Sequence, residues 1–221
     1  MKIGYLKEAV ESTGLQPEVR EATWAKLEAL KAAGHVVEAV DFPLIKYFLP
    51  TYYILTTAEA SSNLSRFDGV KFGHRTANPV DLMQLYKRTR QEGFGAEVQR
   101  RIMLGTFVLS ADYYDAYYTK AQKVRRLIQD KTLAILGAYD FIISPTTSST
   151  AYKVGEKTAD PIQMYLGDLF TVQANVAGIP GLSIPMGVDS EGLPMGFQLM
   201  TSPYQEQKLL NLGELINSDE K

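Results

Sequence analysis

The 221-residue chain contains no cysteine and only two histidines, His35 and His74. The lack of cysteine excludes disulfide bonds and thiolate metal sites, and it favours a reducing compartment. Two histidines so far apart in the sequence argue against a histidine-based metal site. His35 follows the expected end of a helix, which is typical of a turn residue rather than of a metal ligand.

A basic surplus is also missing, because 23 Lys and Arg residues stand against 25 Asp and Glu, a net charge of −2. Tight nucleic-acid binding usually needs a basic surplus, so this chain alone is not expected to bind nucleic acid tightly. No apolar run approaches the roughly 18 residues that a membrane span requires. The first residues indicate a strand rather than a signal peptide. We therefore expect a soluble, cytoplasmic protein that does not bind membranes.

The stretch 173–187 predicts the end of an apolar helix, a tight turn and a buried strand. Gly178 stands where a helix end needs a positive φ, and Pro180 prevents the helix from continuing. Pro185 interrupts the strand, which indicates an edge strand or a bulge. A packing corner with no chemistry of its own is the simpler interpretation of this stretch.

Residues 2–42 predict a strand, a helix that begins at Pro17 and ends at Gly34, and a second, parallel strand. Because the chain begins inside a strand, we expect it to be a segment of something larger. A helix is also expected from Asp160 to Gly178.

Residues 45–138 are mostly helical in pattern. We expect a helix over 45–64 that Pro50 breaks near its start, followed by helices over 81–91, 97–110 and 111–136. Small residues within 56–62 should let the first of these helices approach its neighbours closely. The strand 140–145 ends in a polar loop, 146–150, where α/β proteins commonly place ligand contacts. The sequence predicts one α/β domain over 1–221, with its helical portion, 45–138, packed on one side of the sheet.

The helix expected over 97–110 carries an arginine on its apolar face. Arg101 falls on the same side as Val98 and Gly105, whereas Arg100 belongs to the polar face. An inward guanidinium needs an anion, and its planar fork matches a carboxylate. That anion is either part of a ligand or a structural partner within the protein. Asp168 raises the same question with the opposite charge, because apolar residues lie one turn to either side of it. Its carboxylate needs a cationic partner or several hydrogen-bond donors, which belong either to a ligand or to a structural salt bridge within the protein.

No serine of the chain matches a known nucleophile motif. The pairs at 61–62 and 148–149 lie neither in a Gly-x-Ser-x-Gly elbow nor in a Ser-x-x-Lys motif, so we expect neither to act as a nucleophile. The basic run 120–131 indicates a solvated helix face, with an RNA or protein contact as the alternative. The tyrosines between Tyr47 and Tyr118 indicate semi-buried packing rather than a stacking platform, while the tyrosine-rich segment 113–118 would also suit a binding or assembly module.

Several motifs are specific enough to compare with known families. They are Ala58-Glu-Ala-Ser-Ser-Asn-Leu-Ser-Arg-Phe-Asp-Gly69, Gly93-Phe-Gly-Ala-Glu-Val-Gln-Arg-Arg-Ile-Met-Leu-Gly-Thr-Phe107, Tyr113-Tyr-Asp-Ala-Tyr-Tyr118, Ser144-Pro-Thr146 and Asn175-Val-Ala-Gly-Ile-Pro-Gly181. Together they strongly resemble the A subunits of glutamyl-tRNA(Gln)/aspartyl-tRNA(Asn) amidotransferases, within the amidase signature family.

The resemblance implies an α/β fold with a mixed sheet flanked by helices, of which this chain represents the C-terminal half. It implies that Tyr52, Arg101 and Asp168 hold glutamine. Arg101 would bind the α-carboxylate and Asp168 the α-ammonium, and Tyr52 would add a hydrogen bond. The serine nucleophile, bridging cis-serine and lysine base of the family belong to the N-terminal half, so we expect this chain to carry no catalytic nucleophile.

The resemblance also implies a function, the release of ammonia from glutamine for amidation of mischarged Glu-tRNA(Gln) or Asp-tRNA(Asn). The implied partners are the B and C subunits, with charged tRNA reached through the complex. ATP and magnesium would be used by a partner subunit, and this chain is expected to bind no cofactor or metal. The alternative is a non-catalytic module that binds an amino acid or assembles subunits.

Overall fold

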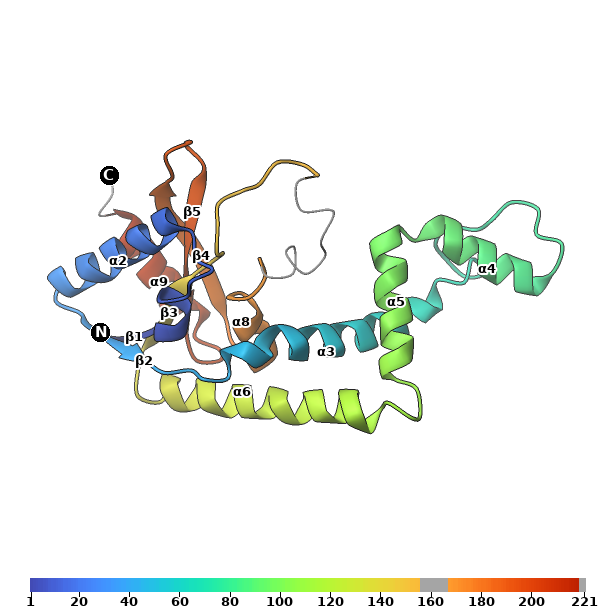
Figure 1. Cartoon of the computed structure of the whole chain (residues 1–221), viewed down its shortest axis with the longest axis horizontal. Coiled ribbons are helices and arrows are strands. Elements are labelled where there is room, and N and C mark those ends of the chain that lie inside the picture. The colour runs from blue at the N-terminus through green and yellow to red at the C-terminus, as the bar shows by residue number, and fades with distance from the viewer. Residues whose placement is uncertain (156–166, 219–221) are drawn as a thin grey trace. The chain divides into compact units, whose positions relative to one another are not determined.

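A computed structural model describes residues 1–155 and 167–218 of the chain (Figure 1). Contacts divide the chain into two compact units, a sheet unit of Met1–Leu49 with Arg125–Lys221, and a helical unit of Pro50–Val124. The expected packing of 45–138 on the sheet stays a prediction. Among the described residues, no helix has both the length and the apolar character that a membrane crossing needs.

The sheet unit holds a five-stranded mixed sheet in the order β2-β1-β3-β5-β4. The strands β1 (Lys2–Leu6), β2 (Val36–Val40) and β3 (Phe141–Pro145) run parallel. The strand β5 (Pro194–Met200) runs antiparallel to both β3 and β4 (Gly181–Val188). All five residues of β3 are buried, as expected of a central strand covered on both faces.

Two groups of helices cover the sheet (Figure 1). The helices α2 (Pro17–Ala32) and α9 (Glu206–Ser218) lie on the face that carries Leu182 and Met186, since residues of all three elements line one hollow or approach within contact distance. The helix α8 (Val172–Ala177) lies on the opposite face, where its Ala174 approaches Gly181. Short helices α1 (Lys7–Val10) and η1 (Ile45–Tyr47) complete the unit, together with most of α6 (Lys120–Leu136).

The expected strand–helix–strand unit of the first 42 residues is confirmed. Pro17 occupies the first turn of α2, where its missing N–H has no partner to lose. The helix buries Val19, Leu27 and Leu30 against the sheet unit's core and ends at Ala32, just before Gly34.

The corner formed by residues 173–187 is also confirmed. Gly178 adopts φ 70°, the left-handed conformation that ends α8. The side chains of Arg125 and Gln129 donate to the last carbonyls of α8, at 3.2 and 2.8 Å. The strand β4 lies at the edge of the sheet, and its register shifts between Pro185 and Val188. Proline has no N–H to donate to a neighbouring strand, so it is tolerated at this position.

The helical unit is built from α3 (Phe48–Asn63), η2 (Leu64–Arg66), α4 (Leu82–Gly93), α5 (Ala96–Val108) and the π-turn η3 (Asp115–Thr119). The expected break at Pro50 is wrong, because α3 begins two residues earlier and the proline falls in its tolerant first turn. The helix expected over 111–136 is confirmed from Lys120 to Leu136, but its expected start is wrong, because a turn and the π-turn η3 precede α6.

Gly105 fixes how closely α3 and α5 approach. A Cβ at Gly105 would lie 1.9 Å from the carbonyl oxygen of Thr57 and 2.7 Å from the Cβ of Ser61. Beside this contact, the hydroxyls of Ser61 and Thr106 lie 3.0 Å apart. The expectation that small residues allow close helix packing here is therefore confirmed.

Candidate functional site

Arg101 is the arginine of α5 that turns inward. Its side chain is 33% exposed, whereas that of Arg100 is 55% exposed. Glu97, one turn earlier, pairs with both, and its Oε1 lies 3.0 Å from Nε of Arg101. The structural ion pair considered for Arg101 is thus present. Since the hydrogen bond from Nε orients the guanidinium, Glu97 holds the plane of the fork.

Tyr52 shares the helical unit with Arg101. The ring of Tyr52 packs edge-on against that of Tyr53, with centroids 5.2 Å apart. The guanidinium carbon of Arg101 lies 5.6 Å from the Tyr53 centroid, within the range of a cation–π contact. The close packing of α3 on α5 therefore brings the half-buried Tyr52, Tyr53 and Arg101 into one neighbourhood.

Asp168 differs from the expectation of an inward residue on a helix. It is exposed and lies in a turn, and its carbonyl accepts from the N–H groups of Thr171 and Val172 just before α8 begins. Most of the helix expected from Asp160, including Met164 and Tyr165, lies outside the described residues. Asp168 belongs to the sheet unit and the other two residues to the helical unit, so their convergence on glutamine stays a prediction.

The polar loop 146–150 follows β3 as expected, and Gln16 forms hydrogen bonds with it. The Gln16 N–H donates to the Ser148 carbonyl at 2.8 Å, and its Oε1 accepts from the Thr150 N–H at 3.0 Å. Beside it, the hydroxyls of Thr146 and Ser183 lie 2.6 Å apart. Ser183 was not singled out from the sequence, although the alternation along β4 places it on the face opposite Leu182 and Ile184.

A cleft of about 680 Å³ opens next to this loop, and its lining includes the acidic residues Glu18, Asp189 and Glu191. Hydrogen bonds from Ser190 lower the pKa of Glu18, and a backbone hydrogen bond from Leu193 lowers the pKa of Asp189. Both carboxylates therefore stay ionised at neutral pH. The lining includes Gln16, Glu18, Ser149, Thr150, Tyr152, Lys153, Asp189, Ser190, Glu191 and Leu193.

The two serine pairs have structural contacts in place of a catalytic base. The hydroxyl of Ser61 bonds with Thr106, and that of Ser149 donates to the Thr150 carbonyl at 3.2 Å. A nucleophilic serine needs a basic group within hydrogen-bond reach, and these contacts do not supply one. Ser61 therefore has a packing role between α3 and α5, and Ser149 lines the cleft beside the loop.

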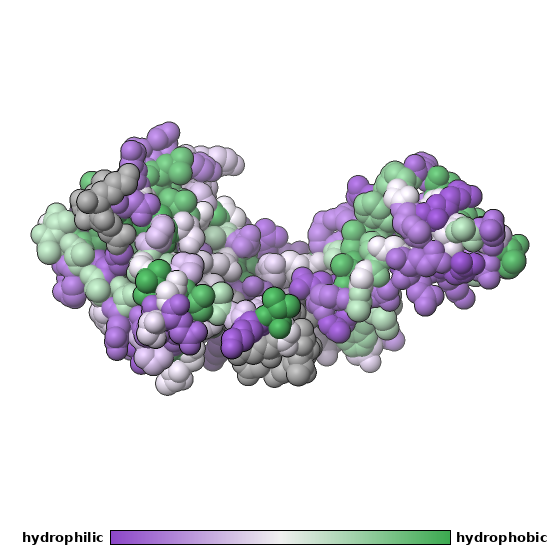
Figure 2. Space-filling view, turned by 90° about the horizontal axis from the view of Figure 1, so that it is seen from above, coloured by the Kyte–Doolittle hydropathy of each residue, from purple (hydrophilic) through white to green (hydrophobic). Residues whose placement is uncertain are grey.

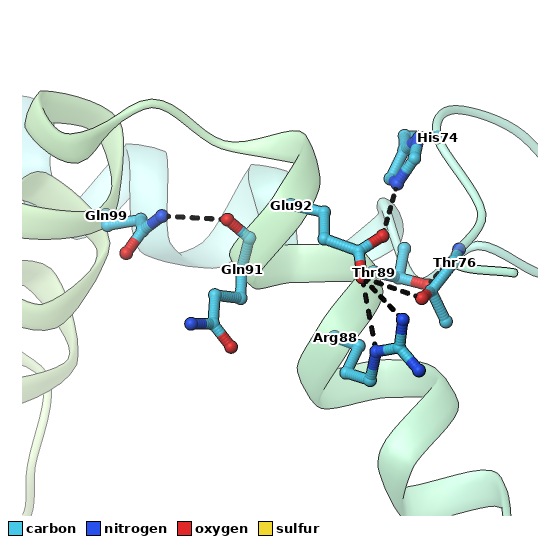
Figure 3. A network of polar contacts seen from close by, with 7 residues as sticks. All are labelled: His74, Thr76, Arg88, Thr89, Gln91, Glu92 and Gln99. Carbon is cyan, nitrogen blue, oxygen red and sulfur yellow. Dashed lines mark hydrogen bonds and ion pairs between the residues drawn. The ribbon is translucent and has the colours of Figure 1, made fainter. Parts of the chain in front are cut away.

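A polar network fastens the loop before α4 to that helix (Figure 3). Glu92 Oε2 lies 2.9 Å from His74 Nε2, and Oε1 accepts from the Thr76 hydroxyl at 2.8 Å and from Arg88 at 3.2 Å. The Thr76 N–H donates to the Thr89 hydroxyl at 3.1 Å. Hydrogen bonds, from His74 first and then from Thr76, lower the pKa of Glu92.

Comparison with known proteins identifies the family of this chain. The Amidase family matches residues 1–210. The chain belongs to the amidase family. Its resemblance to amidotransferase A subunits, and the expected mixed sheet flanked by helices, are confirmed by the relatives below.

Amidase-family relatives include the A subunit of glutamyl-tRNA(Gln) amidotransferase from Pseudomonas fluorescens (strain SBW25), which is 52% identical over 221 residues. That match covers 99% of this chain and 45% of the relative. The A subunit from Thermosynechococcus vestitus is 51% identical, over 96% of this chain and 44% of the relative. The chain thus spans less than half the length of the curated relatives it matches.

Two solved structures share this fold. The crystal structure of the A subunit from Thermotoga maritima matches with a TM-score of 0.67 and 41% identity, over 92% of this chain and 39% of that one. A crystal structure of an amidase matches with a TM-score of 0.76 at 21% identity, over 99% of this chain and 45% of that one, which shows the shared fold.

Proposed function

We propose that this chain is part of the glutaminase component of a tRNA-dependent amidotransferase, and that it carries residues for binding glutamine but not the nucleophile. The observation that supports this most is identity of about one half to amidotransferase A subunits over nearly the whole chain. Function resides in sites rather than folds, so the proposal depends on particular side chains.

Glutamine carries an α-carboxylate and an α-ammonium, and the proposed site answers each with an opposite charge. The Arg101 fork donates two parallel hydrogen bonds to the carboxylate, while Glu97 keeps the plane of the fork fixed through Nε. Asp168 accepts from the ammonium, and the Tyr52 hydroxyl adds a further hydrogen bond. Such a site selects free amino acids, because a blocked end leaves one charge without a partner.

The released ammonia would then amidate mischarged Glu-tRNA(Gln) or Asp-tRNA(Asn). In this proposal the B and C subunits are the protein partners, and charged tRNA is reached through the complex. ATP and magnesium serve one of these partners, since this chain is proposed to contribute only to amide hydrolysis. Within the described residues, no group of three His, Asp or Glu side chains is placed to hold a metal ion.

A chimera tests the proposal, in which these 221 residues replace the matching segment of the Pseudomonas fluorescens relative, co-expressed with the B and C subunits. We expect the chimera to release ammonia from glutamine and the isolated chain to release none. Turnover by the isolated chain that disappears in Ser61→Ala or Ser149→Ala would contradict the proposal. So would a folded chimera complex without glutaminase activity.

A further inference from the structure

A buried glutamine, Gln198, interrupts the apolar sequence of strand β5. Hydrophilic residues cover much of the surface visible in Figure 2, as expected of side chains in contact with water. Gln198 is an exception, because it is only 5% exposed and stands between the fully buried Phe197 and Leu199. Burial of an amide costs free energy unless its hydrogen bonds are satisfied, so the partners of this side chain indicate its role.

The Gln198 amide nitrogen has two acceptors. Its Nε2 donates at 3.1 Å to the hydroxyl of Ser144, the residue paired with Gln198 on the neighbouring strand β3. It also donates at 2.9 Å to the main-chain carbonyl of Phe170. A carbonyl oxygen can only accept, so the nitrogen end of the amide must face Phe170. Gln198 therefore joins an interior strand of the sheet to the turn that precedes α8.

That turn carries Asp168. The Asp168 carbonyl accepts from the N–H groups of Thr171 and Val172, at 3.1 and 3.2 Å, and from the Thr171 hydroxyl at 3.0 Å. These contacts fix Asp168 within the turn, while the buried Phe170 side chain and the hydrogen bond to the Phe170 carbonyl fix the turn on the sheet. The place of the exposed Asp168 within the sheet unit therefore depends on Gln198.

We propose that Gln198 is a positioning residue for glutamine binding, which acts by holding the turn that carries Asp168. This rests on the proposed function, in which Asp168 accepts from the α-ammonium of glutamine. Recognition of a charge needs a carboxylate that is held in place, and a displacement of about 1 Å can lower a rate by about 100-fold. Methionine is about as long as glutamine but has no N–H group, so Gln198→Met keeps the packing and removes the hydrogen bond to Phe170.

Steady-state kinetics of the chimera complex with two substrates tests this inference. The second substrate is glutaric acid monoamide, which is glutamine without its α-ammonium group. Gln198→Met should lower kcat/KM by about tenfold or more for glutamine and by less than about twofold for the monoamide, because only glutamine needs Asp168. Ser144→Ala, a milder change that removes one acceptor of the amide, should lower kcat/KM by about threefold for glutamine alone.

Two controls separate positioning from a loss of stability. Thr201→Val removes another buried side-chain donor to a main-chain carbonyl, that of Asp140 at 2.9 Å. It should change kcat/KM by less than about twofold for either substrate, because it does not touch the turn of Asp168. In a chimera that already carries Asp168→Ala, Gln198→Met should change kcat/KM for glutamine by less than about twofold, since the carboxylate that Gln198 positions is gone.

Three results would overturn the inference. They are an equal loss of kcat/KM for glutamine and for the monoamide, an equal effect of Thr201→Val, and an undiminished effect of Gln198→Met in the Asp168→Ala chimera. A complex that hydrolyses glutamine equally well with and without Gln198→Met would refute the positioning role and leave the proposed function standing. A folded chimera complex without glutaminase activity would contradict both.

Discussion

At the residue scale, Arg101 illustrates what a helical pattern can and cannot tell. Its position relative to Val98 and Gly105 correctly separated it from the more exposed Arg100. The pattern could not choose between a ligand and a structural partner, because both satisfy an inward guanidinium. The structure supplies Glu97 for one edge of the guanidinium, and the glutamine carboxylate remains a prediction.

Arg101→Lys should weaken glutamine binding by about tenfold or more. Lysine keeps the charge but loses the planar fork, and hydrogen bonds to a charged group contribute about 1.5–3 kcal/mol. A ligand-observed NMR titration of the folded chain measures the dissociation constant even when binding is weak. The matched control is Arg100→Lys, which alters the other arginine paired with Glu97. Equal loss in both variants would assign Arg101 a structural role alone.

Asp168 shows where periodicity fails. Apolar residues spaced around it favoured a helix, yet it occupies a turn before α8 and is exposed. A turn that leads into a helix repeats nearly the same spacing over one or two turns, so sequence spacing does not locate the first helical residue. The signals that did locate element ends are local and stereochemical, such as Pro17 at the start of α2 and Gly178 after α8.

At the element scale, the contact between α3 and α5 depends on the absence of a side chain. Gly105→Ala would place a methyl group 1.9 Å from the Thr57 carbonyl, so the helices must separate. Alanine favours the helix by about 1 kcal/mol, but overpacking against backbone should outweigh this and leave a net loss of at least about 1 kcal/mol.

Chemical denaturation followed by circular dichroism measures the loss in Gly105→Ala. Gly95→Ala serves as the control, because a Cβ there meets no atom within 4 Å and φ is −63°. Its free energy of unfolding should fall by less than about 1 kcal/mol, the usual difference between glycine and alanine at a helix N-cap. Equal stability of Gly105→Ala and the unchanged chain would show that α3 and α5 do not meet as described.

The hydrogen bonds that hold the loop before α4 against that helix should weaken at acidic pH. The pKa of Glu92 is lowered in the folded chain, so its contribution is present above its ordinary value of 4.5 and is lost as the pH falls through the folded value. Hydrogen exchange of the Thr76 N–H, which donates to Thr89, should therefore accelerate from about pH 5 to about pH 3 beyond the intrinsic trend.

Glu92→Gln removes the titrating group of this network (Figure 3) while keeping its length. Exchange of the Thr76 N–H in that variant should be faster at pH 6 and should lose the additional dependence on pH. An unchanged acid response in Glu92→Gln would assign it to another carboxylate.

The π-turn η3 is an element that the sequence did not reveal. A π-turn holds one residue more than an α-turn, so the apolar spacing of 111–136 still looked helical. The strands were easier to predict, because β3 opens with the apolar run 141–143 and Pro185 marks the edge strand with its shifted register. Pairing order depends on contacts between distant segments, which local patterns do not encode.

At the scale of the whole molecule, composition and motif settled different questions. The lack of cysteine excluded disulfide bonds and thiolate metal sites, and the balanced charge argued against tight nucleic-acid binding. Long motifs such as 93–107 identified the family that the comparisons confirm. Arg101 and Asp168, on whose convergence the proposed glutamine site depends, belong to different compact units.

The measurement that tests the central claim most directly is kcat/KM for glutamine in the chimera with and without Arg101→Ala. Removing the fork leaves the glutamine carboxylate without its partner, which should lower kcat/KM by about 100-fold or more, since breaking a buried charge pair costs about 3–5 kcal/mol. Arg100→Ala should stay within about threefold, as expected of an exposed arginine. A folded Arg101→Ala chimera that hydrolyses glutamine at the unchanged rate would contradict the account.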